Sequence, residues 1–170
     1  MASQLYRPYM KTMMAPGDGD NGHSGATVNL LDDSSTPISI VLVDDSGSYA
    51  FSRDHDFYND VSGGALTGGT SLGGVSRAIE ALDTPVLTNG TTGVKYDAVD
   101  FTAAGTGSIT NVGDGSKALN AIVIFHNTGD VATAELIAFI DTGTGFDVTP
   151  NASTVDIVWH ENGIFNFNYT

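Results

Sequence analysis

The sequence predicts an all-β protein of antiparallel strands, arranged as a sandwich, a jelly roll or a small barrel. Glycine, which weakens helices and supplies tight turns, accounts for 21 of the 170 residues. Charged residues make up 15%, against roughly 25% in ordinary domains, whereas a long soluble helix needs a charged face. Short apolar runs are separated by turn residues, as in β-sandwiches and barrels.

The first 25 residues differ from the rest, so we expect an N-terminal arm with a flexible loop (residues 1–25) ahead of a single β domain (residues 26–170). Met1–Met14 is aromatic and methionine-rich, and Pro16–Gly25 has no apolar residue after Pro16. A frayed end, or a first strand packed on the domain, is the alternative. Tyrosine, methionine and arginine are enriched at interfaces, so the residues predicted to dock on a partner are Tyr6, Arg7, Tyr9, Met10, Lys11, Met13 and Met14.

The first strands of the domain are marked by apolar runs. Ile38–Val43 is aliphatic except for one serine, which predicts a strand buried on both faces. Ser48–Ser52 is the expected returning strand, and Arg53–Asp60 a loop with one turn of helix. Val61–Gly74 reads as a long loop or weak edge strands, and Ser76–Leu82 as a strand or a short helix.

Turn residues organise the middle of the chain. Val86–Thr88 and Val94–Tyr96 flank Asn89-Gly90, a favoured hairpin pair. Alternation over residues 99–103 predicts a half-buried strand, and Ser108–Val112 another weak one.

The C-terminal third carries the clearest patterns. Leu119–His126 and Ala134–Asp141 are apolar runs that should pair antiparallel. Val155–His160 and Ile164–Tyr169 predict a second hairpin, with Trp159 in the core.

The charge balance excludes several classes of partner. Twenty acidic residues against six basic ones give a formal charge of −14, which repels nucleic-acid phosphates and anionic lipid, so we expect neither as a partner. Cysteine is absent, which rules out disulfides and thiolate zinc sites. Met1–Ala15 lacks the apolar core of a signal peptide, and no apolar run approaches a membrane span. We therefore expect synthesis in a cytoplasm.

A search for catalytic groups predicts no enzyme, no cofactor and no metal. His23 lies beside Ser24, but adjacency in sequence does not make a catalytic triad. His126 and His160 end predicted strands, where a polar residue leaves the core, and are interpreted as structural.

Two acidic loops are the candidates for a cation. Asp54-His55-Asp56 with Asp60 forms the densest titratable cluster, and the favoured interpretation is a solvated acidic loop. Residues 18–22 open like a calcium loop, but His23 stands where glycine is needed and no glutamate closes it.

Seven segments resemble a family of small β-rich proteins encoded among the structural genes of tailed bacteriophages. Together they span most of the chain from Ile40 onward, and the closing Trp-to-Ile-Phe segment is the most specific. The matching segments are Ile40–Asp44, Tyr49–Ser52, His55–Val61, Tyr96–Ala103, Ala121–Gly129, Glu135–Asp141 and Ile157–Phe165.

The resemblance implies a non-enzymatic virion protein, and within it we expect a capsid cement or decoration protein on the outer capsid surface. Its partners would be the major capsid protein and copies of itself, in a closed homo-oligomer such as a trimer. The first alternative is a tail, head–tail connector or fibre-associated protein. The second is a carbohydrate-binding β-sandwich on the virion surface, with Tyr49, Tyr58 and Trp159 as aromatic platforms.

Overall fold

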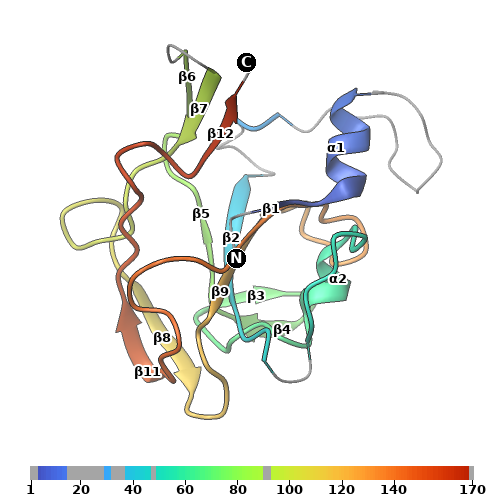
Figure 1. Cartoon of the computed structure of the whole chain (residues 1–170). Helices are drawn as coiled ribbons and strands as arrows, with labels where there is room; N and C mark the ends of the chain where they lie inside the picture. The colour runs from blue at the N-terminus through green and yellow to red at the C-terminus, as the bar shows by residue number, and fades with distance from the viewer. Residues whose placement is uncertain (1–3, 15–28, 32–36, 47–48, 90–92, 169–170) are drawn as a thin grey trace.

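The computed structural model describes residues 4–14, 29–31, 37–46, 49–89 and 93–168 (Figure 1). Strands dominate and pair antiparallel in several sheets, which confirms the all-β prediction. No closed barrel forms among these residues. None of their helices is long and apolar enough to cross a membrane.

A five-stranded antiparallel sheet forms the centre of the fold. Its spatial order is β1 (Gln4–Leu5), β10 (Leu136–Ile140), β9 (Ala121–His126), β2 (Ile38–Val43) and β5 (Ile79–Ala81). Every residue of β2 is buried, as its continuous aliphatic run predicts. The predicted antiparallel pairing of β9 with β10 is confirmed.

Three smaller sheets complete the strands of the described residues. They are β12 (Phe165–Asn168) with β7 (Gly93–Asp97) and β6 (Val86–Asn89), β11 (Asn151–Val155) with β8 (Ile109–Asp114), and β3 (Thr70–Leu72) with β4 (Val75–Arg77). The β6–β7 pairing confirms the hairpin predicted around Asn89, although residues 90–92 lie outside the described residues.

The two faces of the central sheet are covered differently. Directly paired residues of neighbouring strands share a face, so Val41, Val123 and Phe139 lie together with Phe125 on one side, here called the aromatic face. Phe51 stacks on Phe139 with ring centroids 4.2 Å apart, and Tyr58 packs on Phe125 at 5.0 Å. Helices α1 (Arg7–Met14) and α2 (Tyr58–Val61) lie on one side of the sheet, opposite the β12–β7–β6 and β11–β8 sheets (Figure 1).

Residues 4–9 pack on the domain through β1, Tyr6 and Tyr9, so the prediction of an arm separate from the domain is wrong for them. β1 pairs with β10 at the edge of the central sheet, which matches the alternative of a first strand on the domain. Tyr6 and Tyr9 are 0% and 1% exposed. The Tyr6 hydroxyl lies 3.3 Å from that of Tyr49. These aromatic side chains serve the protein's own core because burying them there removes a large apolar area from water.

Two predicted strands and one predicted hairpin are also wrong. Residues 49–52 form no strand: Tyr49 and Phe51 instead pack around Tyr6. Residues 99–103 contribute a single bridge, Phe101 to Ile157. The predicted C-terminal hairpin does not form, because β12 pairs with β7 and β11 pairs with β8. Long-range pairing overrides the local hairpin pattern in this last case.

Candidate binding groove

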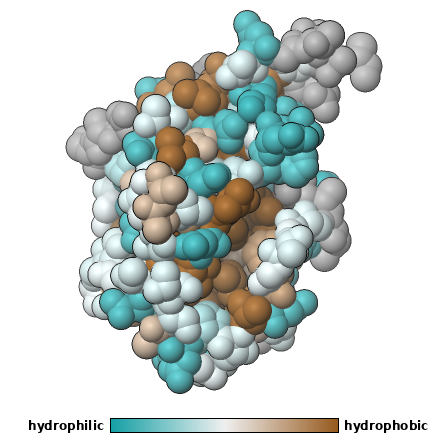
Figure 2. Space-filling model, turned by 90° about the vertical axis from the view of Figure 1, so that its left-hand side faces the viewer, coloured by the Kyte–Doolittle hydropathy of each residue, from teal (hydrophilic) through white to brown (hydrophobic). Residues whose placement is uncertain are grey.

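An open groove of about 710 Å³ lies on the side of the central sheet opposite the aromatic face. Ile122 and Ile140, paired across β9 and β10, belong to its lining with Leu119, Ile157 and Ile164. These five residues are 5–9% exposed, whereas most of the core is 0–2% exposed. In Figure 2 apolar residues gather in a hollow between more polar ridges on this side of the molecule. We call this side of the sheet the groove face.

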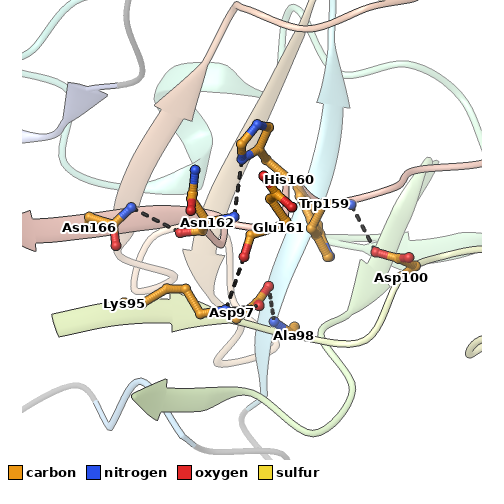
Figure 3. Close-up of polar contacts among 9 residues, drawn as sticks. All are labelled: Lys95, Asp97, Ala98, Asp100, Trp159, His160, Glu161, Asn162 and Asn166. Atoms are coloured by element: carbon orange, nitrogen blue, oxygen red, sulfur yellow. Dashed lines mark hydrogen bonds and ion pairs between the residues drawn. The ribbon is translucent and has the colours of Figure 1, made fainter. Parts of the chain in front are cut away.

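The first wall of the groove is the segment from Ile157 to Ile164, which leaves β11 and returns to β12. Ile157 exchanges backbone hydrogen bonds of 2.9 Å with Phe101 in both directions. The backbone N–H of Trp159 donates to Asp100 Oδ1 at 2.8 Å (Figure 3). The Trp159 ring packs edge-on against Phe101 at 6.2 Å. The wall is thus tied to the segment that follows β7, although it forms no regular strand.

The turn that ends this wall is held by Lys95 and by a glycine. Lys95 Nζ donates to the Glu161 carbonyl at 3.3 Å and pairs with Asp97 at 2.9 Å (Figure 3). Asn162 donates its backbone N–H to His160 Nδ1 at 3.1 Å. Gly163 has φ +86°, and a Cβ there would lie 2.5 Å from Lys95 Cγ. Glycine is therefore required at this turn.

The second wall is the loop after β10, residues 142–148. Asp147 N–H donates to the Leu119 carbonyl at 2.8 Å, and Leu119 N–H donates back to Val148. Phe146 lines the groove beside Gly143 and is partly buried against the core. The loop therefore lies against the chain that enters β9, which fixes the width of the groove.

Carboxylates surround the groove. Asp156 belongs to its lining, and Asp141 and Asp147 adjoin lining residues of the second wall. Burial and the nearby carboxylate of Asp141 raise the pKa of Asp45 above its ordinary value. The charges of Asp44 and Asp147 add to this rise, so three carboxylates lie within electrostatic range of Asp45. This side of the molecule therefore carries a negative potential.

The nearby Asp44 has the opposite shift. Burial raises its pKa, but hydrogen bonds from Ser46 and Ala118 and the charge of Lys117 outweigh burial and leave the pKa below its ordinary value. Ser46 Oγ and the Ala118 N–H donate to the two Asp44 oxygens at 2.6 and 3.0 Å. Asp44 therefore anchors the loop after β2 to the chain that enters β9.

The structure separates the predicted docking residues from one another. Arg7 is exposed and pairs with Asp54 at 2.8 Å, and Lys11 is exposed on the same helix. Met10 is half-buried. Met13 and Met14 belong to α1, but their side chains lie outside the described residues, as does the rest of the predicted arm, residues 1–3 and 15–25.

The acidic loop around His55 is engaged in local contacts. Asp54 forms the ion pair with Arg7, and Asp60 Oδ2 accepts the N–H groups of Asp56 and Phe57 at 3.0 and 3.4 Å, which caps α2. His55 packs against the Tyr49 ring. The described part of the chain holds no cluster of three or more ligand side chains able to bind a metal ion. The second candidate loop, residues 18–22, lies outside the described residues.

Of the three predicted sugar platforms, two are closed to solvent. Tyr49 and Tyr58 are 4% and 1% exposed. Trp159 is half-buried: its ring packs against Phe101 and it also lines the groove, so its predicted place in the core is only partly correct. Its indole Nε1 is buried and has no acceptor among the described residues.

Comparison with protein-family models, curated proteins and solved structures finds no match to this chain. Sequence reasoning missed the groove because its lining comes from β9, β10, the loop 142–148 and residues 154–164. One signal was present. Val158 follows Ile157 in a run of three apolar residues, so any extended backbone must turn one of them outward. Val158 is 69% exposed.

Proposed function

We propose that this protein is a non-enzymatic structural component of a tailed-phage particle, most favourably a capsid cement or decoration protein. Its partners would be the major capsid protein and further copies of itself. The proposal starts from the resemblance of the seven segments between Ile40 and Phe165 to phage structural proteins. It requires a surface that binds protein, and the groove face offers one.

The observation that carries the proposal is an apolar groove on a surface of strongly negative charge. Apolar residues exposed together on a soluble protein mark sites of interaction. The floor of the groove consists of core residues, so a partner seated there would extend the hydrophobic core across the interface. A formal charge of −14 keeps the free protein soluble until it meets that partner.

The fold proposed alongside this function is a jelly-roll-like sandwich. Support comes from β2, which is buried on both faces and therefore needs a layer on either side. A rigid β body of this kind suits a protein that bridges neighbouring capsomers under the pressure of packaged DNA. Binding at several joints at once would multiply a modest affinity at each.

Gold-labelled antibody microscopy of intact particles tests the proposal. Label distributed over the head is the expected result. Label confined to the tail or neck would replace the cement role with the alternative of a tail, connector or fibre-associated protein. Particles without label would remove the virion role altogether.

A carbohydrate-binding module is the second candidate, and Trp159 favours it. A partly exposed indole that lines the same groove as the polar Thr142, Thr144 and Asp156 offers a sugar ring both an aromatic surface and hydrogen-bonding groups. Glycan-array binding that disappears in Trp159→Ala, with the variant still folded by circular dichroism, would establish this function. The absence of any glycan signal would remove it.

A further inference from the structure

Strand β11 runs beside the groove, and one of its edges faces no other described strand. β11 pairs with β8 alone among the described strands, so one of its edges has no strand partner there. Thr154 and Val155, at the end of β11, line the groove, and the lining continues through Ile157. An unpaired strand edge beside apolar pockets is the geometry by which proteins take up extended peptides.

The charges around the groove determine which segment fits. Asp156 lies in the lining, and Asp141 and Asp147 adjoin it. Lys95, which holds the turn at the end of the first wall, is already paired with Asp97 at 2.9 Å. A segment that brings lysine or arginine would meet side chains of opposite charge, whereas an acidic segment would be repelled.

Four of the six basic side chains, Lys95 among them, already have partners within the protein itself. Arg7 pairs with Asp54, and Arg53 donates to the Gln4 side chain. Lys117 Nζ donates to two backbone carbonyls, those of Gly63 and Ala65. Each copy also carries a formal charge of −14, so two acidic surfaces would have to meet. The charge pattern therefore favours a different, basic protein.

We propose that the groove binds an extended segment of a basic partner protein, with apolar side chains over Ile140 and Ile157 and a lysine or arginine beside Asp156. The partner's backbone would lie along the free edge of β11. This inference rests on the proposed function, because the natural source of the segment would be another protein of the particle. It adds the chemistry of the segment and the place where it binds.

Titration of the full chain with defined peptides tests the inference. The probes are a peptide of alternating lysine and valine, one of glutamate and valine, and one of lysine and serine. Trp159 is the only tryptophan, so its fluorescence reports on the groove directly. Changes in backbone NMR chemical shifts identify the other residues that the peptide contacts. We expect the lysine–valine peptide to change Trp159 fluorescence, with shifts confined to residues 140–164 and the neighbouring β9, and much weaker binding of the other two.

Matched variants distinguish binding in the groove from nonspecific attraction to the acidic surface. Val148→Ser and Asp156→Asn change the groove, and Val75→Ser and Asp83→Asn are the controls. Val148 and Val75 are each 46% exposed, so the two serine variants remove the same exposed area. Combining the two groove changes should raise Kd about tenfold, because both remove contacts that the peptide would make in the groove. The combined control should leave Kd unchanged.

Several results would overturn the inference. These are shifts spread over the whole acidic surface, equal binding of the lysine–serine peptide, or equal losses in groove and control variants. Self-association of the free protein that Val148→Ser abolishes would also overturn it, because a second copy would then occupy the groove. Labelled heads with no peptide binding would remove this inference and leave the proposed function. Peptide binding with unlabelled particles would do the reverse.

Discussion

The two faces of the central sheet differ in how completely the chain covers them. On the aromatic face Phe125 and Phe139 are 0% exposed beneath Tyr58 and Phe51. On the groove face Ile140 reaches 8% and Val158 stands fully outside the core. The central sheet is thus fully covered on its aromatic face and incompletely covered on its groove face. Stability should therefore depend on the first face and binding on the second.

The largest effect is expected from Phe139→Ala on the aromatic face. The variant removes a fully buried ring and its stacking on Phe51, so it should lower the free energy of unfolding by about 3–5 kcal/mol. Urea denaturation measures the loss. Phe146→Ala is the matched control on the groove face, and its partly buried ring should cost clearly less. Equal losses would mean that the two faces are equally well packed.

Ile157→Ala and Val158→Ala compare neighbours in the groove wall. Ile157 is 9% exposed and Val158 is 69% exposed. We expect Ile157→Ala to cost about 2 kcal/mol, at the low end for a buried isoleucine, and Val158→Ala to stay within about 0.5 kcal/mol. Thermal unfolding of both variants checks this. A large loss at Val158 would show that it packs in the core.

Gly163→Ala tests the turn at the end of the wall. The added Cβ would meet Lys95 Cγ at 2.5 Å and the Tyr96 carbonyl at 2.6 Å, in a residue with φ +86°. A loss of about 1–3 kcal/mol is expected from strain and displacement together. Gly129→Ala is the control, since Gly129 has φ +84° but open space around it. If the two variants lose the same stability, backbone strain alone accounts for the effect.

Alkaline pH should destabilise the aromatic side of the molecule. Burial raises the pKa of Tyr49 and of Tyr58 to about 12, above the value near 10 expected in the unfolded chain. Folding therefore favours the protonated phenols, and this stabilisation is complete below pH 10 and declines as the pH rises from 10 towards 12. Urea midpoints should fall across that range, and Tyr49→Phe should flatten the decline. A midpoint independent of pH would contradict the burial of these hydroxyls.

On the aromatic side, a smaller stability effect than that of Phe139→Ala is expected from Tyr6→Phe. The variant keeps the ring and removes one hydroxyl, whose partner Tyr49 OH lies 3.3 Å away. A loss of about 0.5–1.5 kcal/mol is typical of such a hydrogen bond. Double-mutant analysis with Tyr49→Phe measures the coupling between the two hydroxyls. Additive losses would mean that the hydroxyls do not interact.

The sequence predicted the elements whose burial is uniform and failed where distant segments meet. The aliphatic run of β2 and the two apolar runs of β9 and β10 identified three neighbouring strands and one of their pairings. Tyr6 and Tyr9 were predicted to dock on a partner because composition does not tell whether an aromatic residue near the N-terminus packs in the protein's own core or against another protein. The groove was invisible because its floor and walls come together only through the tertiary pairing of Ile157 with Phe101 and of Leu119 with Val148.

The order of strands in the central sheet has a consequence for biosynthesis. β2 pairs with β9, and β1, near the start of the chain, pairs with β10, so the sheet joins segments far apart in sequence. Such non-local pairing slows folding, because the entropy of closing a long loop is lost before any stabilising contact forms. While the ribosome is still making residues 44–120, the six apolar-rich residues of β2 have no β9 to pair with. A nascent chain of this kind is exposed to aggregation until β9 and β10 have emerged.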